Sequence, residues 1–205
     1  MDLQKLRRKV NPEHTAVVII DMQRDYCCEG GIFDKMGFDL EVPRRLASRL
    51  NDFVNEVRKA LKHIVHIKMT IMPELASPAM KEQYERVGLQ RKYDPSYGDF
   101  FGITPVEGEV VIPKYRYSSF VSTYLDKFLR ANGIKTLVVV GLSTNVCVES
   151  TVRDGFMLDY NVVVPADMTE TSSREEKKWS LRTIDTFFGE VVESKDLLVC
   201  WGLAQ

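Results

Sequence analysis

Short apolar runs alternate along the chain with longer stretches whose apolar residues recur at helical spacing. The first run, Thr15 to Ile20 (TAVVII), is continuous and mostly β-branched, as expected of a strand covered on both faces. Residues 42–61 then show the periodicity of an amphipathic helix. The alternation continues to a last strand near Val191. This order predicts βαβ units, and therefore an α/β fold with a parallel sheet.

The remaining elements follow from the same two periodicities. Further strands are expected at residues 63–69, 109–112, 136–140 and 161–164. Further helices are expected from Ser118 or Ser119 to Asn132, where Gly133 would end the helix, from Val146 to Asp159, and from Ser172 to Phe188. Residues 72–108 follow neither pattern, and we expect a helix and a lid-like loop there.

Composition narrows the class of protein. The chain has 205 residues, 44% of them hydrophobic and 28% charged, with a net charge of −1. These values predict one globular domain over residues 1–205 and favour neither a nucleic-acid nor a membrane partner. The N-terminus is polar and no apolar run approaches the roughly 18 residues of a membrane span, so we expect a cytoplasmic protein. Its four cysteines lack disulfide or zinc spacing and are expected to be free thiols.

Three chemically active side chains follow predicted strands. Asp21 comes directly after the first strand, Lys114 after the third, and Cys147 after the turn that leaves residues 136–140. Ligands of an open parallel sheet bind beyond the carboxyl ends of its strands, so these residues share one edge. The set suits attack on a carbonyl: Cys147 as thiolate nucleophile, favoured by a helix N-terminus and Lys114, and Asp21 as proton carrier. Backbone N–H groups of the turn would hold the oxyanion.

Each of these residues also has a structural explanation. An Asp after a strand commonly caps a turn, a Lys is commonly solvated, and a Cys commonly packs as a small hydrophobe. Other chemistries fit less well. The segment Gly141–Asn145 nearly matches G-x-S-x-G, but Asn145 replaces the last Gly and no His follows. There is no glycine-rich phosphate loop, and Gln23 stands where an aspartyl phosphatase would have a second Asp.

Three segments together resemble the isochorismatase-like cysteine hydrolases: IIDMQRDY with Asp21, VIPKYRYSSF with Lys114, and VVVGLSTNVCVESTVRDGF with Cys147. The likeness runs from residue 15 to residue 192. It implies one Rossmann-like three-layer domain, a six-stranded parallel sheet with helices on both faces, a Cys/Asp/Lys triad and a homo-oligomer. It also implies a cis Leu142–Ser143 peptide bond that would aim the N–H groups of Ser143 and Cys147 at the oxyanion.

Details of the resemblance indicate the amidase branch. True isochorismatases lack the cysteine, and nicotinamidases bind a metal through an Asp and histidines after the second strand. Residues 70–74 (TIMPE) contain no His, so no metal and no cofactor are expected. Segments 30–39, 114–120, 144–160 and 184–192 are most similar to ureidoacrylate amidohydrolases and biuret hydrolases. The resemblance therefore implies hydrolysis of a C–N bond in a small ureido or carbamoyl amide, through a covalent thioester intermediate.

The expected substrate contacts flank the triad: Gln23, Tyr26, Arg116, Tyr117 and Asn145. Core packing is the alternative role for the two tyrosines. If Arg116 reached the substrate, its guanidinium could hold a carboxylate and favour acids like ureidoacrylate. If it paired with a neighbouring carboxylate, a neutral ureide would be favoured. Two other functions remain open: an amidase for N-carbamoyl amino-acid derivatives, and a non-catalytic member that binds a small ligand or a partner.

Overall fold

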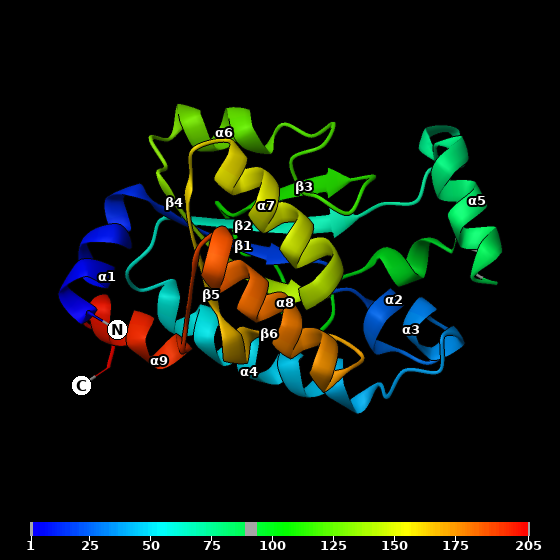
Figure 1. Cartoon of the computed structure of the whole chain (residues 1–205), viewed down its shortest axis with the longest axis horizontal. Coiled ribbons are helices and arrows are strands. Elements are labelled where there is room, and N and C mark those ends of the chain that lie inside the picture. Colours follow the sequence, from blue (N-terminus) through cyan, green and yellow to red (C-terminus); the bar gives the residue numbers. More distant parts are fainter. Residues whose placement is uncertain (1, 89–93, 205) are drawn as a thin grey trace.

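A parallel sheet runs through the middle of the structure, a computed structural model that describes residues 2–88 and 94–204 (Figure 1). Its strands are β1 (Thr15–Ile20), β2 (His63–Met69), β3 (Val110–Lys114), β4 (Thr136–Leu142), β5 (Asn161–Pro165), β6 (Thr169–Glu170) and β7 (Glu190–Val192). Six of them follow the order β3-β2-β1-β4-β5-β7, and the two-residue β6 pairs with the end of β4. Every pairing is parallel. The predicted six-stranded parallel sheet is confirmed.

Helices lie on both faces of the sheet (Figure 1). They are α1 (Leu3–Lys9), α2 (Arg24–Cys27), α3 (Ile32–Lys35), α4 (Glu41–Val57), α5 (Pro78–Arg86), α6 (Leu125–Ala131), α7 (Glu149–Met157), α8 (Arg174–Phe187) and α9 (Ser194–Cys200). Helix α4 packs against β4 and α9, and α7 packs against β5 and α8. All residues of β1 and β4 are buried, which explains their uninterrupted apolar sequence. No helix in the described part of the chain is long and apolar enough to cross a membrane.

The helix expected from Ser118 or Ser119 begins only at Leu125, so that prediction is wrong at its start. Both serines instead hold the preceding turns. The Ser118 hydroxyl accepts a hydrogen bond from Phe120 N at 3.2 Å. Ser119 bonds to the hydroxyl of Thr151. Hydroxyl side chains that bond to the nearby backbone compete with helix formation. The helix ends as predicted, with Gly133 at φ +68° just beyond it.

Two other stretches differ from expectation. The helix expected from Val146 is a five-residue π-helical turn, η4 (Thr144–Val148), followed by α7. Residues 72–108 contain α5 and two short 3₁₀ helices, η2 (Pro73–Leu75) and η3 (Pro95–Gly98). The lid-like loop expected in this stretch falls partly on residues 89–93, outside the described residues. A third 3₁₀ turn, η1 (Pro12–His14), leads into β1, and a fourth, η5 (Ala166–Met168), precedes β6.

The carboxyl ends of β1, β2 and β3 point toward the end of the molecule that carries α2, α3 and α5 (Figure 1). Both chain termini lie at the opposite end, beside α1 and α9. Strands β1 and β4 approach closely at the carboxyl edge, because Gly141 has no side chain there. A Cβ at Gly141 would lie 2.2 Å from the carbonyl oxygen of Ile20, and Gly141 adopts φ +110°. The two strands that precede Asp21 and Cys147 are thus held together at their ends.

Candidate active site

The side chains of Asp21, Lys114 and Cys147 lie together at the carboxyl edge of the sheet. Lys114 Nζ is 2.8 Å from Asp21 Oδ2. It also donates a hydrogen bond to the carbonyl oxygen of Tyr117 at 2.7 Å. The Cys147 thiol is within hydrogen-bonding contact of both Lys114 and Asp21. All three side chains are buried, and a thiol, a carboxylate and an ammonium group therefore share one protected site.

Burial dominates the ionisation of the cysteine. The pKa of the Cys147 thiol is raised to about 12, chiefly by burial and also by the carboxylate of Asp21, while the ammonium of Lys114 acts to lower it. Burial alone would lower the pKa of Lys114, but Asp21 and Cys147 more than offset burial, and the pKa of Lys114 is raised. Burial and Asp21 therefore oppose the thiolate that we expected the surroundings to favour, whereas Lys114 acts in the expected direction. Lys114 is the one neighbour of the two that favours the thiolate, and it forms an ion pair with Asp21.

The turn that carries Cys147 is fixed by hydroxyl side chains. The Thr151 hydroxyl donates to the carbonyl oxygen of Cys147 at 2.7 Å and accepts from the backbone N–H of Ser119 at 3.0 Å. Because Ser119 belongs to the segment that follows Lys114, this contact joins the lysine strand to the cysteine turn. Sequence reasoning missed this link. Ser119 and Thr151 lie 32 residues apart, and no pattern in the sequence pairs them.

A second set of contacts holds the other side of the turn. The Thr144 and Thr169 hydroxyls lie 2.9 Å apart, and Thr169 also donates to the carbonyl oxygen of Gly141. The expected cis peptide bond is present at Leu142–Ser143. The carbonyl oxygen of Ser143 accepts from Val146 N and Val148 N, both at 3.1 Å. The proposed oxyanion donors, the N–H groups of Ser143 and Cys147, thus belong to a turn held at both ends.

The five expected substrate contacts have different surroundings. The Gln23 amide is bound to the protein itself: Nε2 donates to the carbonyl oxygens of Met69 and Gly98, and Oε1 accepts from Met69 N. Tyr26 is buried and packs edge-on against Phe33 at 5.1 Å. These contacts join the ends of β1 and β2 to η3 and anchor α2. The side chains of both residues are therefore engaged in contacts within the protein.

The other three expected contacts lie nearer to solvent. Asn145 accepts a hydrogen bond from the Thr171 hydroxyl and donates to Glu176. Tyr117 is 39% exposed. Arg116 Nη1 donates to two carbonyl oxygens, of Leu75 at 3.0 Å and of Tyr115 at 2.7 Å. The partners of Arg116 Nη1 are thus backbone carbonyls and not a carboxylate, and a contact of Arg116 with the substrate stays a prediction.

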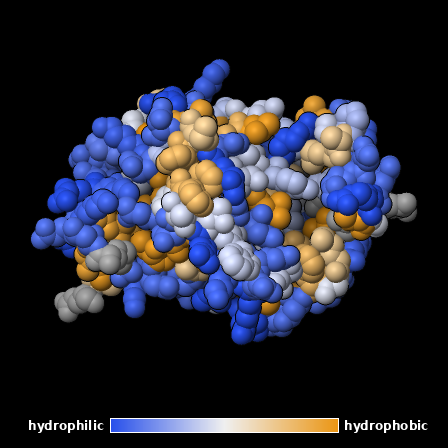
Figure 2. Space-filling model, in the orientation of Figure 1, coloured by the Kyte–Doolittle hydropathy of each residue, from blue (hydrophilic) through white to orange (hydrophobic). Residues whose placement is uncertain are grey.

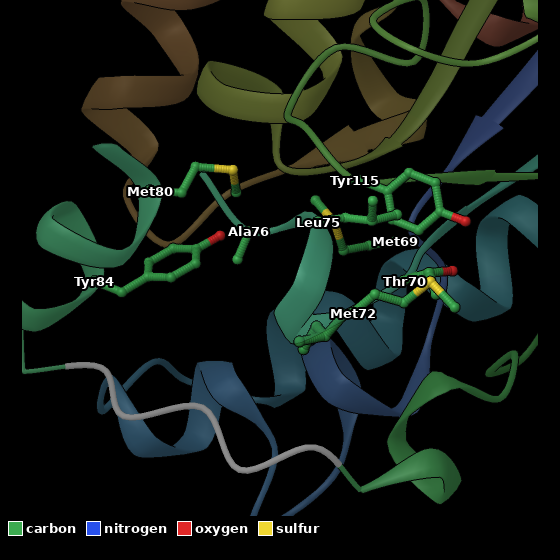
Figure 3. Close-up of a pocket in the computed structure, with 9 residues that line it drawn as sticks. Met69, Thr70, Met72, Leu75, Ala76, Met80, Tyr84 and Tyr115 are labelled. Carbon is green, nitrogen blue, oxygen red and sulfur yellow. The ribbon is translucent and has the colours of Figure 1, made fainter. Parts of the chain in front are cut away.

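An apolar pocket lies at the same edge of the sheet, next to Lys114. Figure 3 shows Met80 and Tyr84 of α5 on one side of it and Met69, Thr70 and Tyr115 on the other. It is small and partly open to solvent. Sequence reasoning did not find this pocket, because its walls come from β2, β3 and the stretch after residue 72 that showed no clear pattern. Among the described residues, no cluster of three or more His, Cys, Asp or Glu side chains could hold a metal ion.

Comparisons with known proteins agree with this architecture. The family model of the isochorismatase domain matches residues 15–196. The ureidoacrylate amidohydrolase RutB of Klebsiella pneumoniae is 36% identical over 197 residues, covering 88% of this chain and 84% of that protein. RutB of Yersinia enterocolitica is 34% identical over 203 residues, covering 91% and 88%.

A solved structure shows the same fold. The crystal structure of a cysteine hydrolase from Pseudomonas syringae superposes with a TM-score of 0.82 at 26% identity and covers 96% of each chain. The match of the family model alone spans most of the sequence. The chain therefore belongs to the isochorismatase family and is a cysteine hydrolase.

Proposed function

We propose that this hydrolase cleaves the C–N bond of a small ureido or carbamoyl amide, with Cys147 as nucleophile, Asp21 as proton carrier and Lys114 as the group that holds Asp21 in place. Amide hydrolysis follows from the family and from relatives at 36% identity that are named amidohydrolases. The observation that carries the rest is the buried Asp21–Lys114 pair in contact with the Cys147 thiol. The ureido group is suggested by the RutB relatives.

The first half of the reaction forms a thioester. Cys147 passes its proton to Asp21, and Sγ bonds to the carbonyl carbon while the oxyanion is held by the N–H groups of Ser143 and Cys147. The tetrahedral intermediate collapses, the C–N bond breaks, and Asp21 returns the proton to the leaving nitrogen. The leaving group departs as ammonia or an amine, and the acyl or carbamoyl group remains on Sγ.

The second half releases the enzyme. Water gives a proton to Asp21 and its oxygen bonds to the carbonyl carbon; the C–S bond then breaks, and the thiol is restored by the proton from Asp21. For a terminal ureide, loss of ammonia followed by hydrolysis gives a carbamic acid, which decomposes to carbon dioxide and an amine. Burial lowers the pKa of Lys114, but Asp21 and Cys147 raise it by more, which favours the charged ammonium. That charge stabilises the Asp21 carboxylate whenever it is deprotonated.

An ammonia-release screen tests the proposal. Ureidoacrylate, biuret, N-carbamoyl amino acids and nicotinamide are compared on the wild type and on Cys147→Ser. We expect release from at least one ureido or carbamoyl compound, little from nicotinamide, and none from any compound with the variant. Efficient turnover of nicotinamide with every ureide inert would contradict the proposed substrate class. Equal turnover by Cys147→Ser would contradict the proposed nucleophile.

Two wider expectations belong to the same proposal. We place the enzyme in the cytoplasm, where four cysteines that are free in the structure would stay reduced. The expected homo-oligomer stays a prediction. Exposed apolar side chains on α7 and α8 support it, among them Met157 and Phe187. Light scattering after size-exclusion chromatography measures the oligomeric state directly.

A further inference from the structure

The pocket of Figure 3 is lined by residues that adjoin Lys114 in the chain and in the sheet. Tyr115 follows Lys114 directly in the chain. Met69 is the register partner of Lys114 across the β2–β3 pairing, and Thr70 N donates to the carbonyl oxygen of Lys114 at 2.9 Å. One wall of the pocket is therefore built by the residues that hold the Lys114 backbone. A group bound there would lie beside the strand end that carries Lys114.

The lining of this pocket is apolar. None of the nine described residues that line it carries a charged side chain. Three of them are methionines, Met69, Met72 and Met80, whose flexible thioethers adapt to hydrocarbon groups. The hydroxyl of Thr70 donates to the carbonyl oxygen of Lys68. A carboxylate placed here would lose its hydration without meeting a cation in the wall.

Arg116 is a charged residue near this pocket, and its Nη1 is bound to backbone carbonyls of the protein. Its Nη1 donates to the carbonyl oxygen of Leu75, in the wall, and to that of Tyr115. Leu75 N in turn donates to the carbonyl oxygen of Met72. The guanidinium thus fixes the η2 turn against the end of β3. This contact holds Leu75, which is one of the residues that line the pocket.

We infer that this pocket binds an uncharged hydrocarbon group attached to the scissile amide, so that the preferred substrates are ureides or amides with a small apolar tail rather than ones with a carboxylate tail. The inference rests on the proposed function and narrows its substrate class. The pocket is small and partly open to solvent, so it suits a short hydrocarbon group. Its position beyond the carboxyl ends of β2 and β3 is where ligands of parallel sheets bind.

Two ureides of equal shape test the inference. Isopentylurea carries a branched hydrocarbon tail, and 3-ureidopropionate carries a carboxylate in the same position. We expect kcat/KM of the wild type for isopentylurea to exceed that for 3-ureidopropionate about tenfold or more, because the acid must bury its charge in an apolar wall. Equal values, or a preference for the acid, would overturn the inference and leave the proposed ureide hydrolysis intact.

A charge placed in the wall should reverse the preference. Leu75→Lys puts an ammonium beside the tail, and it should lower the ratio of the two kcat/KM values to about one or below. Leu75 is 46% exposed and no described residue of the neighbouring α5 is buried, so the fold should tolerate the change. Leu3→Lys is the matched control, because Leu3 is 44% exposed and belongs to α1, at the opposite end of the molecule (Figure 1). The ratio of the two kcat/KM values in Leu3→Lys should equal that of the wild type. An unchanged ratio in Leu75→Lys would overturn the inference.

A second pair separates this inference from the proposed function. 4-Methylpentanamide and succinamate repeat the comparison on a primary carboxamide. If both ureides are inert and 4-methylpentanamide is preferred over succinamate, the ureido assignment fails and the apolar pocket stands. If neither pair is hydrolysed, calorimetric titration of Cys147→Ser decides. Tighter binding of isopentylurea or 4-methylpentanamide than of the matching acid supports the pocket, and equal or absent binding overturns it.

Discussion

Lys114 Nζ lies 2.8 Å from Asp21 Oδ2, and at most 1% of either side chain is accessible to solvent. Each charge is tolerated in the interior because the other is present. Removing one member of such a pair commonly costs about 3–5 kcal/mol, since it leaves an uncompensated buried charge. Stability and the proposed catalysis therefore depend on the same contact, and variants must be designed to separate them.

At the end of the molecule that carries this edge of the sheet, apolar patches interrupt the hydrophilic surface (Figure 2).

Asp21→Asn should abolish turnover and also destabilise the protein. The amide cannot carry the proton of Cys147, and Lys114 loses its counter-charge. The double variant Asp21→Asn/Lys114→Met should recover much of the free energy of unfolding, because it removes both charges, yet stay inactive. Urea unfolding and ammonia release measure the two effects. Activity in the double variant would show that the pair serves stability alone.

Cys147→Ser should lower kcat by about a thousandfold or more with little change in the melting temperature, because a serine hydroxyl is a far weaker nucleophile than a thiolate. Cys200→Ser is the matched control, since Cys200 is also a buried free thiol and lies in α9. It should keep full activity, as should serine at Cys27 and Cys28. An essential role for any of these other cysteines would refute the assignment of the nucleophile.

Thr151→Val tests the link between the lysine strand and the cysteine turn. It leaves the N–H of Ser119 and the carbonyl of Cys147 without their hydroxyl partner, which should cost about 1–3 kcal/mol and lower kcat by displacing the thiol. Thr136→Val is a control of the same chemistry. Its buried hydroxyl donates to the carbonyl oxygen of Lys9, at the other end of β4. We expect a similar loss of stability there with kcat unchanged; an equal fall in kcat for both variants would argue against a local role of Thr151.

The buried His66 should make stability depend on pH. Burial lowers the pKa of His66, although Glu109, 2.7 Å from its Nε2, opposes this effect. A folded-state pKa below the ordinary value means that the contribution of His66 is present above about pH 6.5 and is lost as the pH falls through the lowered pKa. The free energy of unfolding, measured with urea, should fall more between about pH 7.5 and pH 5.5 in the wild type than in His66→Gln. An equal fall in the free energy of unfolding in both proteins would show that a group other than His66 causes the pH dependence.

Activity should survive metal removal. The stretch after β2, residues 70–74, contains no His, and the described residues hold no cluster of ligating side chains. After incubation with EDTA and desalting, we expect the rate of ammonia release to equal that of untreated enzyme. A loss that zinc restores would reveal a metal site that the described residues do not show.

The sequence by itself determined the layers of this protein and the chain positions of its reactive groups. The bounds of β1 and β2 were predicted residue for residue, and β1 is a continuous apolar run because it is buried on both faces. The edge shared by Asp21, Lys114 and Cys147 followed from the rule that parallel strands end on the same side. These are local or periodic properties, which a sequence carries directly.

Only the tertiary structure decided what surrounds those groups. The raised pKa of Cys147 comes from burial by distant segments, and no property of the local sequence reports it. The start of α6 was misplaced because the hydroxyls of Ser118 and Ser119 are engaged in a turn and in a contact with Thr151. Arg116 was expected to contact the substrate because it lies close to Lys114 in the sequence. Its Nη1 donates to the carbonyl oxygen of Leu75, 41 residues away in the chain. Contacts between residues so far apart depend on how the whole chain packs, and that packing is what shapes the pocket beside Lys114.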